Sequence, residues 1–528
     1  YLYMVNLTNQ IRDSIIKIES TNLVYDFIDP YKTPEQNQSV GTGFFILEKE
    51  SGYILTCCHV INRSINIEIT IPSKGKNKYN ASIICVNEDY DLALLKTDYK
   101  NNNYLEFFDS DDLIQGDQLS ALGYPLGQER LKISNGILSG YEKYFLQTDA
   151  AINEGNSGGP LMKDNKVVGV NARKIKSIIA NNIGYAVPIK LFMIMKEQYF
   201  ENQIINRVNL LIKFKVTDYL IKEYYNNSFE EGVLITNISE NSSLYEKGLR
   251  KHDILIEFDK YKLNNYGEVT FKENKFNLND FIYRYKNGQK VLIKYYSINK
   301  NKIIESDVEL RKPNFKLVKI IPSVNSDLIK YEIISGLVFS DLNLNQIELL
   351  EKYDYYYSTD FINLIKYDND FNKFKNKIIL TSILKGSKFI NNHKIFSGLF
   401  LEKINDKIIN TLDEMKEYLL ELKEKKVKFY KFEFSNNHLI IMDMNIIKED
   451  HNNLKKLYKL NQSKFKEKFL NIYKINKTIN NNELDKSFNT DIIGKVINNN
   501  FSMKHLFKIK ELKDGSKYNT GYSNLKNI

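Results

Sequence analysis

The sequence has no tryptophan, only three cysteines and only eight prolines in 528 residues. The cysteines are Cys57, Cys58 and Cys85. Adjacent cysteines rarely pair with each other, so at most one disulfide could form. This count excludes the disulfide framework that stabilises small secreted domains, and it favours a reducing, intracellular compartment that the sequence does not specify further.

Long apolar runs are also missing. No stretch of about 18 apolar residues occurs, so we expect neither a membrane-spanning helix nor a membrane partner. The first residues, Tyr1–Asn6, show neither the basic region nor the apolar region of a signal peptide. A secretory leader is therefore not expected in this stretch.

Most of the chain lacks an excess of charge of either sign. The formal net charge is +10, but residues 451–528 hold 16 lysines against 6 acidic residues and account for all of it. A basic body that binds nucleic acid is therefore not indicated, and only this tail could contact nucleic acid or an acidic partner. Its asparagine runs favour a solvated, partly disordered extension instead.

Between about residues 11 and 190 the chain contains short β segments separated by turns. Many short strands at this spacing indicate an all-β sandwich or barrel. The predicted strands lie at residues 42–47, 53–56, 65–71, 81–86, 92–95, 118–122, 166–170 and 183–187. Pro188 marks the start of a helix that runs to about Asn202. Two stretches that mix strands with short helices follow, so several domains are expected at this length.

The strongest chemical signal is the run Gly155-Asn156-Ser157-Gly158-Gly159-Pro160. An acyl-transfer nucleophile needs a hydroxyl on a tight turn, with backbone N–H groups directed at the developing oxyanion. The flanking glycines permit unusual backbone angles and the close approach of a substrate carbonyl. We therefore predict Ser157 as the nucleophile, with Gly155, Asn156 and Ser157 forming the oxyanion hole and the N–H groups of Gly155 and Ser157 as its donors. A glycine-rich surface turn is the alternative.

Histidine is the usual base beside a catalytic serine. His59 is the only histidine among the first 200 residues, and it follows a predicted strand. Three aspartates, Asp89, Asp91 and Asp98, lie in the right stretch for the orienting carboxylate. Asp91 is preferred because it precedes the apolar Leu92–Leu95 and can be buried against the imidazole. Asp89 is the second choice, and its alternative role is that of a turn residue.

The run Cys57-Cys58-His59 could instead bind a metal. Adjacent cysteines seldom ligate one ion together, no Cys-x-x-Cys pair is present, and the other five histidines lie beyond residue 250. We therefore expect neither a metal nor another cofactor. A cysteine nucleophile is also disfavoured, because serine already occupies the glycine turn.

The order His59, Asp91, Ser157 and the residues around these positions resemble the Deg/HtrA family of serine proteases. The matching motifs are Gly41-Thr-Gly-Phe-Phe-Ile46, Leu55-Thr-Cys-Cys-His-Val60, Asp91-Leu-Ala-Leu-Leu95, Leu122-Gly-Tyr-Pro-Leu-Gly127, Gln147–Leu161 and Asn182-Ile-Gly-Tyr-Ala-Val-Pro188. Two positions depart from the family pattern. Cys57-Cys58 replaces a pair of small residues, and Glu154 stands where proline is common. Neither change removes a catalytic group.

The resemblance continues beyond this segment and implies the architecture. Gly232–Phe258 resembles the core of a PDZ domain, Asn264–Phe271 resembles an insert of plant-type Deg proteases, and Phe432–Asp443 resembles the end of their second PDZ-like domain. The expected fold is multidomain: an all-β chymotrypsin-like double β-barrel, then two α+β PDZ-like domains and a basic C-terminal extension. The expected bounds are 10–200 for the protease, 205–312 and 325–450 for the PDZ-like domains, and 451–528 for the extension.

The family also implies ATP-independent cleavage of misfolded or specific proteins and trimer-based homo-oligomers. In this fold the base of the S1 pocket lies six residues before the nucleophile, at Ala151, and Ile183, Gly184 and Tyr185 would line its wall. A small apolar residue at the base cannot pair with Lys or Arg as the aspartate of trypsin-like enzymes does. Cleavage after small to medium aliphatic residues is therefore expected.

In the second PDZ-like stretch, Gly336-Leu337-Val338-Phe339 resembles the loop that holds a peptide's terminal carboxylate with backbone N–H groups. An ordinary core strand is the alternative. Either PDZ-like stretch could instead pack between subunits and control access to the active site.

Two other classes of function stay open. The chain could be a catalytically resting scaffold or a holdase chaperone, although intact His59, Asp91 and Ser157 argue against lost catalysis. Nucleic-acid binding through the basic tail is the third hypothesis, and deletion of residues 451–528 would test it.

Overall fold

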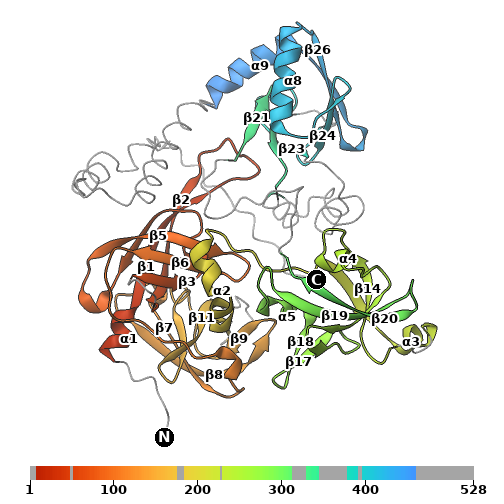
Figure 1. The fold of residues 1–528 in the computed structure, drawn as a ribbon. Coiled ribbons are helices and arrows are strands. Elements are labelled where there is room, and N and C mark those ends of the chain that lie inside the picture. The colour runs from red at the N-terminus through yellow and green to blue at the C-terminus, as the bar shows by residue number, and fades with distance from the viewer. Residues whose placement is uncertain are drawn as a thin grey trace, which may run out of the picture. The chain divides into compact units, whose positions relative to one another are not determined.

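The computed structural model describes residues 8–47, 52–174, 183–225, 229–311, 329–343, 346, 377–390 and 395–458 (Figure 1). Most of the predicted C-terminal extension lies outside the described residues. In the described part the chain forms two closed six-stranded barrels, two larger open sheets and one two-stranded sheet. The predicted double β-barrel is confirmed.

The first barrel is antiparallel, with the strand order β1-β2-β3-β6-β5-β4. Its strands are β1 Ile15–Val24, β2 Glu35–Phe45, β3 Tyr53–Thr56, β4 Ser64–Thr70, β5 Lys78–Asn87 and β6 Leu92–Thr97. β6 pairs with both β3 and β5, and its first four residues are buried. A strand enclosed in this way needs apolar side chains on both faces, which explains the run Leu92–Leu95. The short helix α1, Asn9–Ser14, precedes the barrel and is capped by Thr8.

The second barrel has the strand order β10-β11-β12-β9-β8-β7. Its strands are β7 Gln118–Gly123, β8 Lys132–Glu142, β9 Phe145–Thr148, β10 Pro160–Lys163, β11 Lys166–Lys174 and β12 Gly184–Pro188. Helix α2, Ile189–Glu201, follows directly after Pro188, where the sequence predicts a helix. Closure of both barrels leaves their strands without free edges.

The first open sheet has the strand order β13-β14-β15-β19-β20, with β16 paired to β15. We call residues 205–311 the first PDZ-like module. Its elements are β13 Ile212–Val216, α3 Tyr219–Tyr224, β14 Val233–Ile238, α4 Ser243–Glu246, β15 Ile254–Phe258, β16 Tyr261–Lys262, β17 Glu268–Phe271, β18 Asn274–Asn277, α5 Leu278–Phe281, the 3-10 turn η5 Ile282–Arg284, β19 Lys290–Ser297 and β20 Lys302–Glu309. The separate β17–β18 hairpin falls in and just after the stretch that resembles the plant-type insert.

The second open sheet has the strand order β21-β22-β23-β24-β26-β27, with β25 paired to β24. Its elements are β21 Tyr331–Ile334, β22 Leu337–Asp341, β23 Ile378–Ile383, β24 Phe400–Ile404, β25 Lys407–Ile408, α8 Leu412–Glu424, β26 Phe429–Phe434, β27 Leu439–Asp443 and α9 Met444–Leu457. The predicted domain boundary at residue 450 lies inside α9, whose Leu454 is buried. The lysine-rich part of the sequence that begins at residue 451 therefore starts within a helix.

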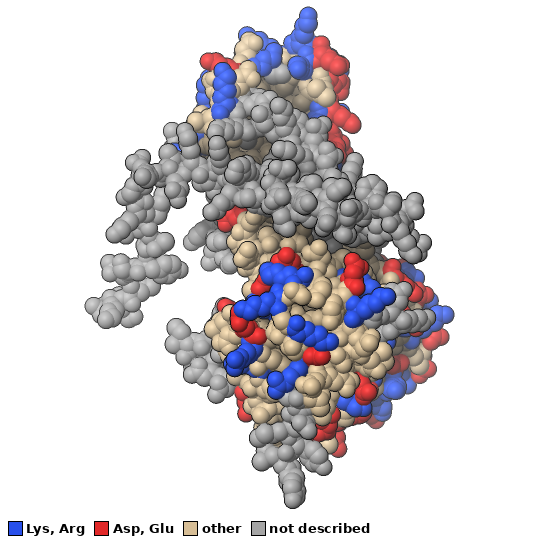
Figure 2. Space-filling view, turned by 90° about the vertical axis from the view of Figure 1, so that its left-hand side faces the viewer, with Lys and Arg blue, Asp and Glu red and all other residues tan. Residues whose placement is uncertain are grey.

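The surface carries both signs of charge. On the face in Figure 2, Lys and Arg side chains lie among Asp and Glu side chains, in keeping with the charge balance of residues 1–450. The three cysteines are buried, and none of them forms a disulfide in the described part of the chain. None of the helices in the described ranges combines the length and the apolar character that crossing a membrane requires.

Candidate active site

The glycine turn that carries Ser157 lies just before β10 and can be formed only with glycine at two positions. Gly155 and Gly158 have φ angles of +94° and +83°, in the left-handed region that side chains rarely adopt. A Cβ on Gly158 would lie 2.1 Å from the Thr56 hydroxyl oxygen and 2.2 Å from the Thr42 carbonyl oxygen. These contacts explain why glycine follows the serine.

The turn is held between the two barrels. The Thr42 N–H of β2 donates to the Ser157 carbonyl at 2.9 Å, and the Gly158 N–H donates to the Asn171 carbonyl of β11 at 2.8 Å. Ser157 is therefore fixed at the junction of the two barrels by backbone contacts to each.

The backbone beside Ser157 bears on the predicted oxyanion hole. The Leu126 N–H donates to the Glu154 carbonyl at 2.7 Å. Because a trans peptide unit directs its C=O and N–H to opposite sides, the Gly155 N–H points away from Leu126. Within the described residues, neither the Gly155 N–H nor the Ser157 N–H donates a hydrogen bond. Two preorganised donors are thus available to a developing negative charge.

Asn156 stabilises this turn but offers no third donor. Its N–H donates to the Asn153 carbonyl at 3.0 Å, and its side-chain nitrogen lies 3.5 Å from the Ala151 carbonyl oxygen. Its side-chain oxygen is buried without a hydrogen-bond partner. Of the three residues predicted for the hole, Gly155 and Ser157 therefore have free N–H groups.

His59 and Asp91 are in direct contact. His59 lies in the 3-10 turn η1, Cys58–Val60, directly after β3, and Asp91 precedes β6 with a φ of +57°. The His59 Nδ1 lies 2.6 Å from one carboxylate oxygen of Asp91, and the His59 backbone N–H donates to the other at 2.9 Å. Since a carboxylate only accepts, Nδ1 carries a proton, and in the neutral imidazole Nε2 is then the acceptor. The pair therefore offers a base whose tautomer and orientation are fixed.

The Ser157 hydroxyl is turned away from this base. It donates to the Ala172 carbonyl of β11 at 3.3 Å, and among the described residues it forms no hydrogen bond with His59. Rotation about the Cα–Cβ bond of Ser157 would redirect the hydroxyl group.

The other two candidate aspartates have different surroundings. The Asp89 carboxylate accepts the Arg207 N–H at 2.9 Å. Asp98 is exposed and follows β6, at the opposite end of that strand from Asp91. The structure thus brings Asp91, and neither alternative, to the imidazole of His59.

Cys57 lies close enough to this pair to raise the question of a metal. The ligand atoms of Cys57, His59 and Asp91 lie within 4.8 Å of one another. The Cys57 thiol, however, donates to the Asn171 carbonyl at 3.2 Å. Burial, aided by the negative charge of Asp91, raises the pKa of Cys57 well above its usual value, so the thiolate that a metal requires is disfavoured. These three side chains therefore fit a histidine oriented by a carboxylate better than a metal centre.

Comparison with known proteins agrees with this chemistry. Residues 41–170 match the trypsin-like peptidase domain family, and residues 322–466 match the PDZ domain family. The putative protease Do-like 13 of Arabidopsis thaliana is 28% identical over 355 residues, 63% of this chain and 70% of that protein. A probable periplasmic serine endoprotease DegP-like of Rickettsia prowazekii is 33% identical over 256 residues, 46% of this chain and 49% of that protein. The chain belongs to the Deg/HtrA family of serine proteases.

The match spans about half of the bacterial relative and a larger share of the plant relative. Among solved structures, the HtrA-type protease AlgW with tripeptide is 25% identical, with a TM-score of 0.45 over 58% of this chain and 96% of that chain. The prediction of a Deg/HtrA protease with PDZ character is confirmed.

In this Deg/HtrA protease the predicted S1 residues lie in the loop after β9 and at the start of β12. Ala151 is exposed, and its carbonyl accepts the Ser134 hydroxyl at 2.7 Å. Gly184 lies in β12, where a Cβ would come 2.9 Å from a methyl carbon of Ile152. Ile183 is partly buried against the core.

Tyr185 departs from the expectation for the pocket wall. Its side chain is 7% exposed, belongs to the core and lies 6.1 Å from the Phe145 ring, measured between centroids. Only its backbone could therefore contribute to a pocket wall.

The predicted carboxylate loop of the Deg/HtrA protease has the structure of a core strand. Leu337, Val338 and Phe339 are fully buried, and β22 is hydrogen-bonded on one edge to β21 and on the other to β23. A peptide adds to a free strand edge. The interpretation of Gly336–Phe339 as a peptide-binding loop is therefore corrected. Leu337–Phe339 belong to a core strand, the alternative interpretation, because no edge of β22 is free.

Sequence reasoning missed Thr42. Its hydroxyl donates to the Gly155 carbonyl at 2.6 Å and accepts the Tyr124 N–H at 3.0 Å, and the residue is fully buried. Because the hydroxyl fixes the Gly155 carbonyl, Thr42 supports the turn of the oxyanion hole. This threonine belongs to the motif Gly41-Thr-Gly, which resembles the Deg/HtrA family, but no role was predicted for it.

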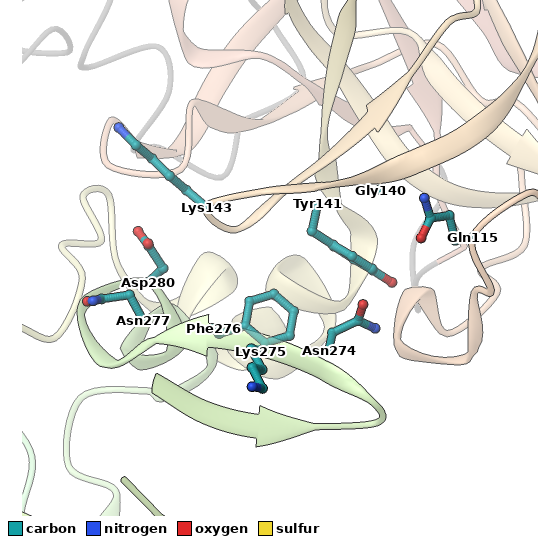
Figure 3. A pocket seen from close by; sticks show the side chains of 9 residues that line it. All are labelled: Gln115, Gly140, Tyr141, Lys143, Asn274, Lys275, Phe276, Asn277 and Asp280. Atoms are coloured by element: carbon teal, nitrogen blue, oxygen red, sulfur yellow. The ribbon is translucent and has the colours of Figure 1, made fainter. Parts of the chain in front are cut away.

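A separate pocket of about 330 Å³ lies between the second barrel and the first PDZ-like module (Figure 3). Its lining residues are Gln115, Gly140, Tyr141, Lys143, Asn274, Lys275, Phe276, Asn277 and Asp280. The rings of Tyr141 and Phe276 approach to 5.6 Å. None of His59, Asp91 and Ser157 lines it, so the pocket marks a contact between modules and is distinct from the candidate catalytic site.

Proposed function

We propose that this chain is an ATP-independent serine endopeptidase that works through an acyl-enzyme intermediate. The observation that carries the proposal is the contact between His59 and Asp91 next to a serine whose turn leaves two N–H groups free. This arrangement supplies a nucleophile, an oriented base and a hole for the oxyanion.

The proposed steps use only these groups. The Ser157 oxygen attacks the substrate carbonyl while His59 Nε2 takes its proton, and the Gly155 and Ser157 N–H groups bind the oxyanion. His59 then protonates the leaving amine, which completes the acyl-enzyme. Water, deprotonated by His59, hydrolyses the ester and restores the Ser157 hydroxyl. Asp91 keeps the imidazole in the required tautomer throughout.

We extend the proposal to the substrate. Ala151 at the base of S1 supports cleavage after small to medium aliphatic residues of misfolded or specific proteins. The PDZ-like modules would serve regulation, assembly into trimer-based oligomers or binding of protein C-termini. The match of residues 322–466 to PDZ domains supports a role in binding peptides or proteins.

The test combines casein degradation with fluorophosphonate labelling of the wild type, Ser157→Ala and Ser120→Ala. Ser120 is a buried serine of β7 in the same barrel, so its substitution controls for folding. We expect labelling and degradation with the wild type and Ser120→Ala, and neither with Ser157→Ala. A peptide-library digest with preferential cleavage after Lys or Arg would overturn the specificity.

One observation favours a second candidate, a catalytically resting scaffold or holdase. The Ser157 hydroxyl donates to Ala172 instead of His59. Failure of the wild type to label under every activating condition, with suppression of client aggregation retained, would favour this candidate over the protease.

A further inference from the structure

The turn that leads into Asp91 is held by a residue of the first PDZ-like module. Tyr90, the residue before Asp91, is fully buried, and its hydroxyl donates to the Tyr283 carbonyl at 2.8 Å. Tyr283 lies in η5, 193 positions further along the chain. The rings of Tyr90 and Tyr283 also meet edge to face at 5.2 Å.

A second tyrosine of the protease joins this contact. Tyr144 follows β8, and its ring stacks on that of Tyr283 with centroids 4.0 Å apart and an interplanar angle of 20°. The Tyr144 hydroxyl donates to the Asp89 carbonyl at 3.1 Å. The ring of Tyr283 thus supports, through Tyr144, the backbone two residues before Asp91.

Arg207 completes the cluster from the segment of residues 203–207, which leads from α2 into the first PDZ-like module. Its N–H donates to the Asp89 carboxylate at 2.9 Å, and its guanidinium lies over the Tyr283 ring at 4.7 Å and donates to the Tyr283 hydroxyl. Residues of this segment also pair with β5 at Val86, just before the turn.

The geometry of Asp91 makes this support relevant to chemistry. Asp91 has a positive φ, its N–H donates to the Glu88 carbonyl at 3.2 Å and its carbonyl accepts the Cys58 N–H at 3.1 Å. Both of its carboxylate oxygens accept hydrogen bonds from His59. A shift of the Asp89–Tyr90 turn would therefore change the direction of the carboxylate relative to the imidazole.

We propose that Tyr283 is a positioning residue for the catalytic histidine, acting through Tyr90 and Tyr144 on the turn that fixes Asp91. The first PDZ-like module thereby completes the protease site without contacting the substrate. This inference rests on the proposed serine endopeptidase function.

The experiment compares Tyr283→Ala with Tyr283→Phe and Arg284→Gln in the full chain. Phenylalanine keeps the ring stack and the carbonyl that Tyr90 uses. Arg284 is the matched control, because it joins the same module to the protease through a mostly buried ion pair with Asp111 and does not contact the turn. The readouts are kcat and KM on a peptide substrate, the rate of fluorophosphonate labelling and the thermal midpoint.

We expect Tyr283→Ala to lower kcat and the labelling rate about tenfold or more, since a small misplacement of a catalytic group is costly. KM should change by less than about twofold, because the substrate contacts are untouched. Tyr283→Phe should restore kcat to within about threefold, and Arg284→Gln should keep it. An unchanged kcat in Tyr283→Ala would refute the proposal, as would an equal fall in Arg284→Gln.

A second measurement does not depend on turnover. The proton shared by His59 Nδ1 and Asp91 should give a far-downfield proton resonance in the wild type and Tyr283→Phe, and a shifted or lost resonance in folded Tyr283→Ala. Tyr90→Phe, which removes one hydroxyl, should shift the same resonance. If the wild type never labels, the endopeptidase proposal fails while this resonance still decides the inference. An active wild type with an unmoved resonance in Tyr283→Ala defeats the inference alone.

Discussion

The Thr42 hydroxyl donates to the Gly155 carbonyl at 2.6 Å, across 113 positions of the chain. Thr42 lies in the first barrel and Gly155 in the turn of the second, so this hydrogen bond joins one barrel to the turn that we propose as the oxyanion hole. It restrains the peptide unit between Gly155 and Asn156. The hydrogen bond from the Leu126 N–H to the Glu154 carbonyl restrains the peptide unit between Glu154 and Gly155.

Thr42→Val should impair catalysis more than folding. Valine matches the shape of threonine but leaves the buried Gly155 carbonyl and Tyr124 N–H without their partner, at a cost of about 1–3 kcal/mol. We expect kcat to fall about tenfold to a hundredfold as the hole loses its geometry. Thr42→Ser, which keeps the hydroxyl, should retain most of the activity. Steady-state kinetics and thermal unfolding of both variants provide the measurement, and equal activity of the two would contradict it.

Asp91→Asn should lower kcat by roughly 10⁴-fold, because an amide no longer selects the tautomer with the Nδ1 proton. The fold should be kept, since the substitution is isosteric. Asp98→Asn is the control, an exposed aspartate from the same stretch of sequence, and should leave kcat unchanged. A large loss with Asp98→Asn would transfer the orienting role away from Asp91.

Gly158→Ala should destabilise the protease domain and abolish activity. Its Cβ would lie 2.1 Å from the Thr56 hydroxyl oxygen, at a φ of +83°. Gly116→Ala is the matched control, with a φ of +95° and no atom within 4 Å of its Cβ. The control should cost only about 1–2 kcal/mol of conformational strain. Thermal unfolding separates the two, and equal midpoints would show that the crowding at Gly158 is relieved at no cost.

Asp280 should make stability depend on pH. Burial raises the pKa of Asp280 above its usual value, and the nearby Lys143 only partly opposes this. The folded state therefore binds the proton more tightly than the unfolded state. This stabilisation is complete below the usual aspartate pKa and is lost as the pH rises through the raised value.

Asp280→Asn removes that loss, so the thermal midpoint of the variant relative to the wild type should rise between about pH 3.5 and about pH 7. Asp307→Asn, at an exposed carboxylate of β20 in the same module, is the control and should show no such trend. A constant difference across this range for Asp280→Asn would argue against a half-buried, proton-binding carboxylate.

The sequence predicts the parts of the fold that local patterns encode. The apolar run Leu92–Leu95 indicates a buried strand, and Pro188 marks a helix start that the structure has. Strand β8, by contrast, was not predicted. It contains two glycines and mostly exposed or half-buried positions, so its residues show no apolar pattern.

The candidate site was predictable as far as residue types permit. The glycine turn points to Ser157, and the scarcity of histidine points to His59. The contact of Tyr90 with Tyr283 could not be predicted, because 193 positions separate the partners and no local pattern links them. The same holds for Gly336–Phe339, since one edge of β22 is filled by the neighbouring β21 but the other by β23, a strand distant in the sequence.

The hydrogen bond from the Cys57 thiol to Asn171 links the end of β3 to β11 and so crosses from one barrel to the other. A polar thiol reagent can reach Cys57 only when the barrels part at this point. In a chain with Cys58 and Cys85 replaced by alanine, the rate of alkylation would therefore report how often the two barrels part at this point. Mass spectrometry can follow this alkylation of Cys57 without any substrate.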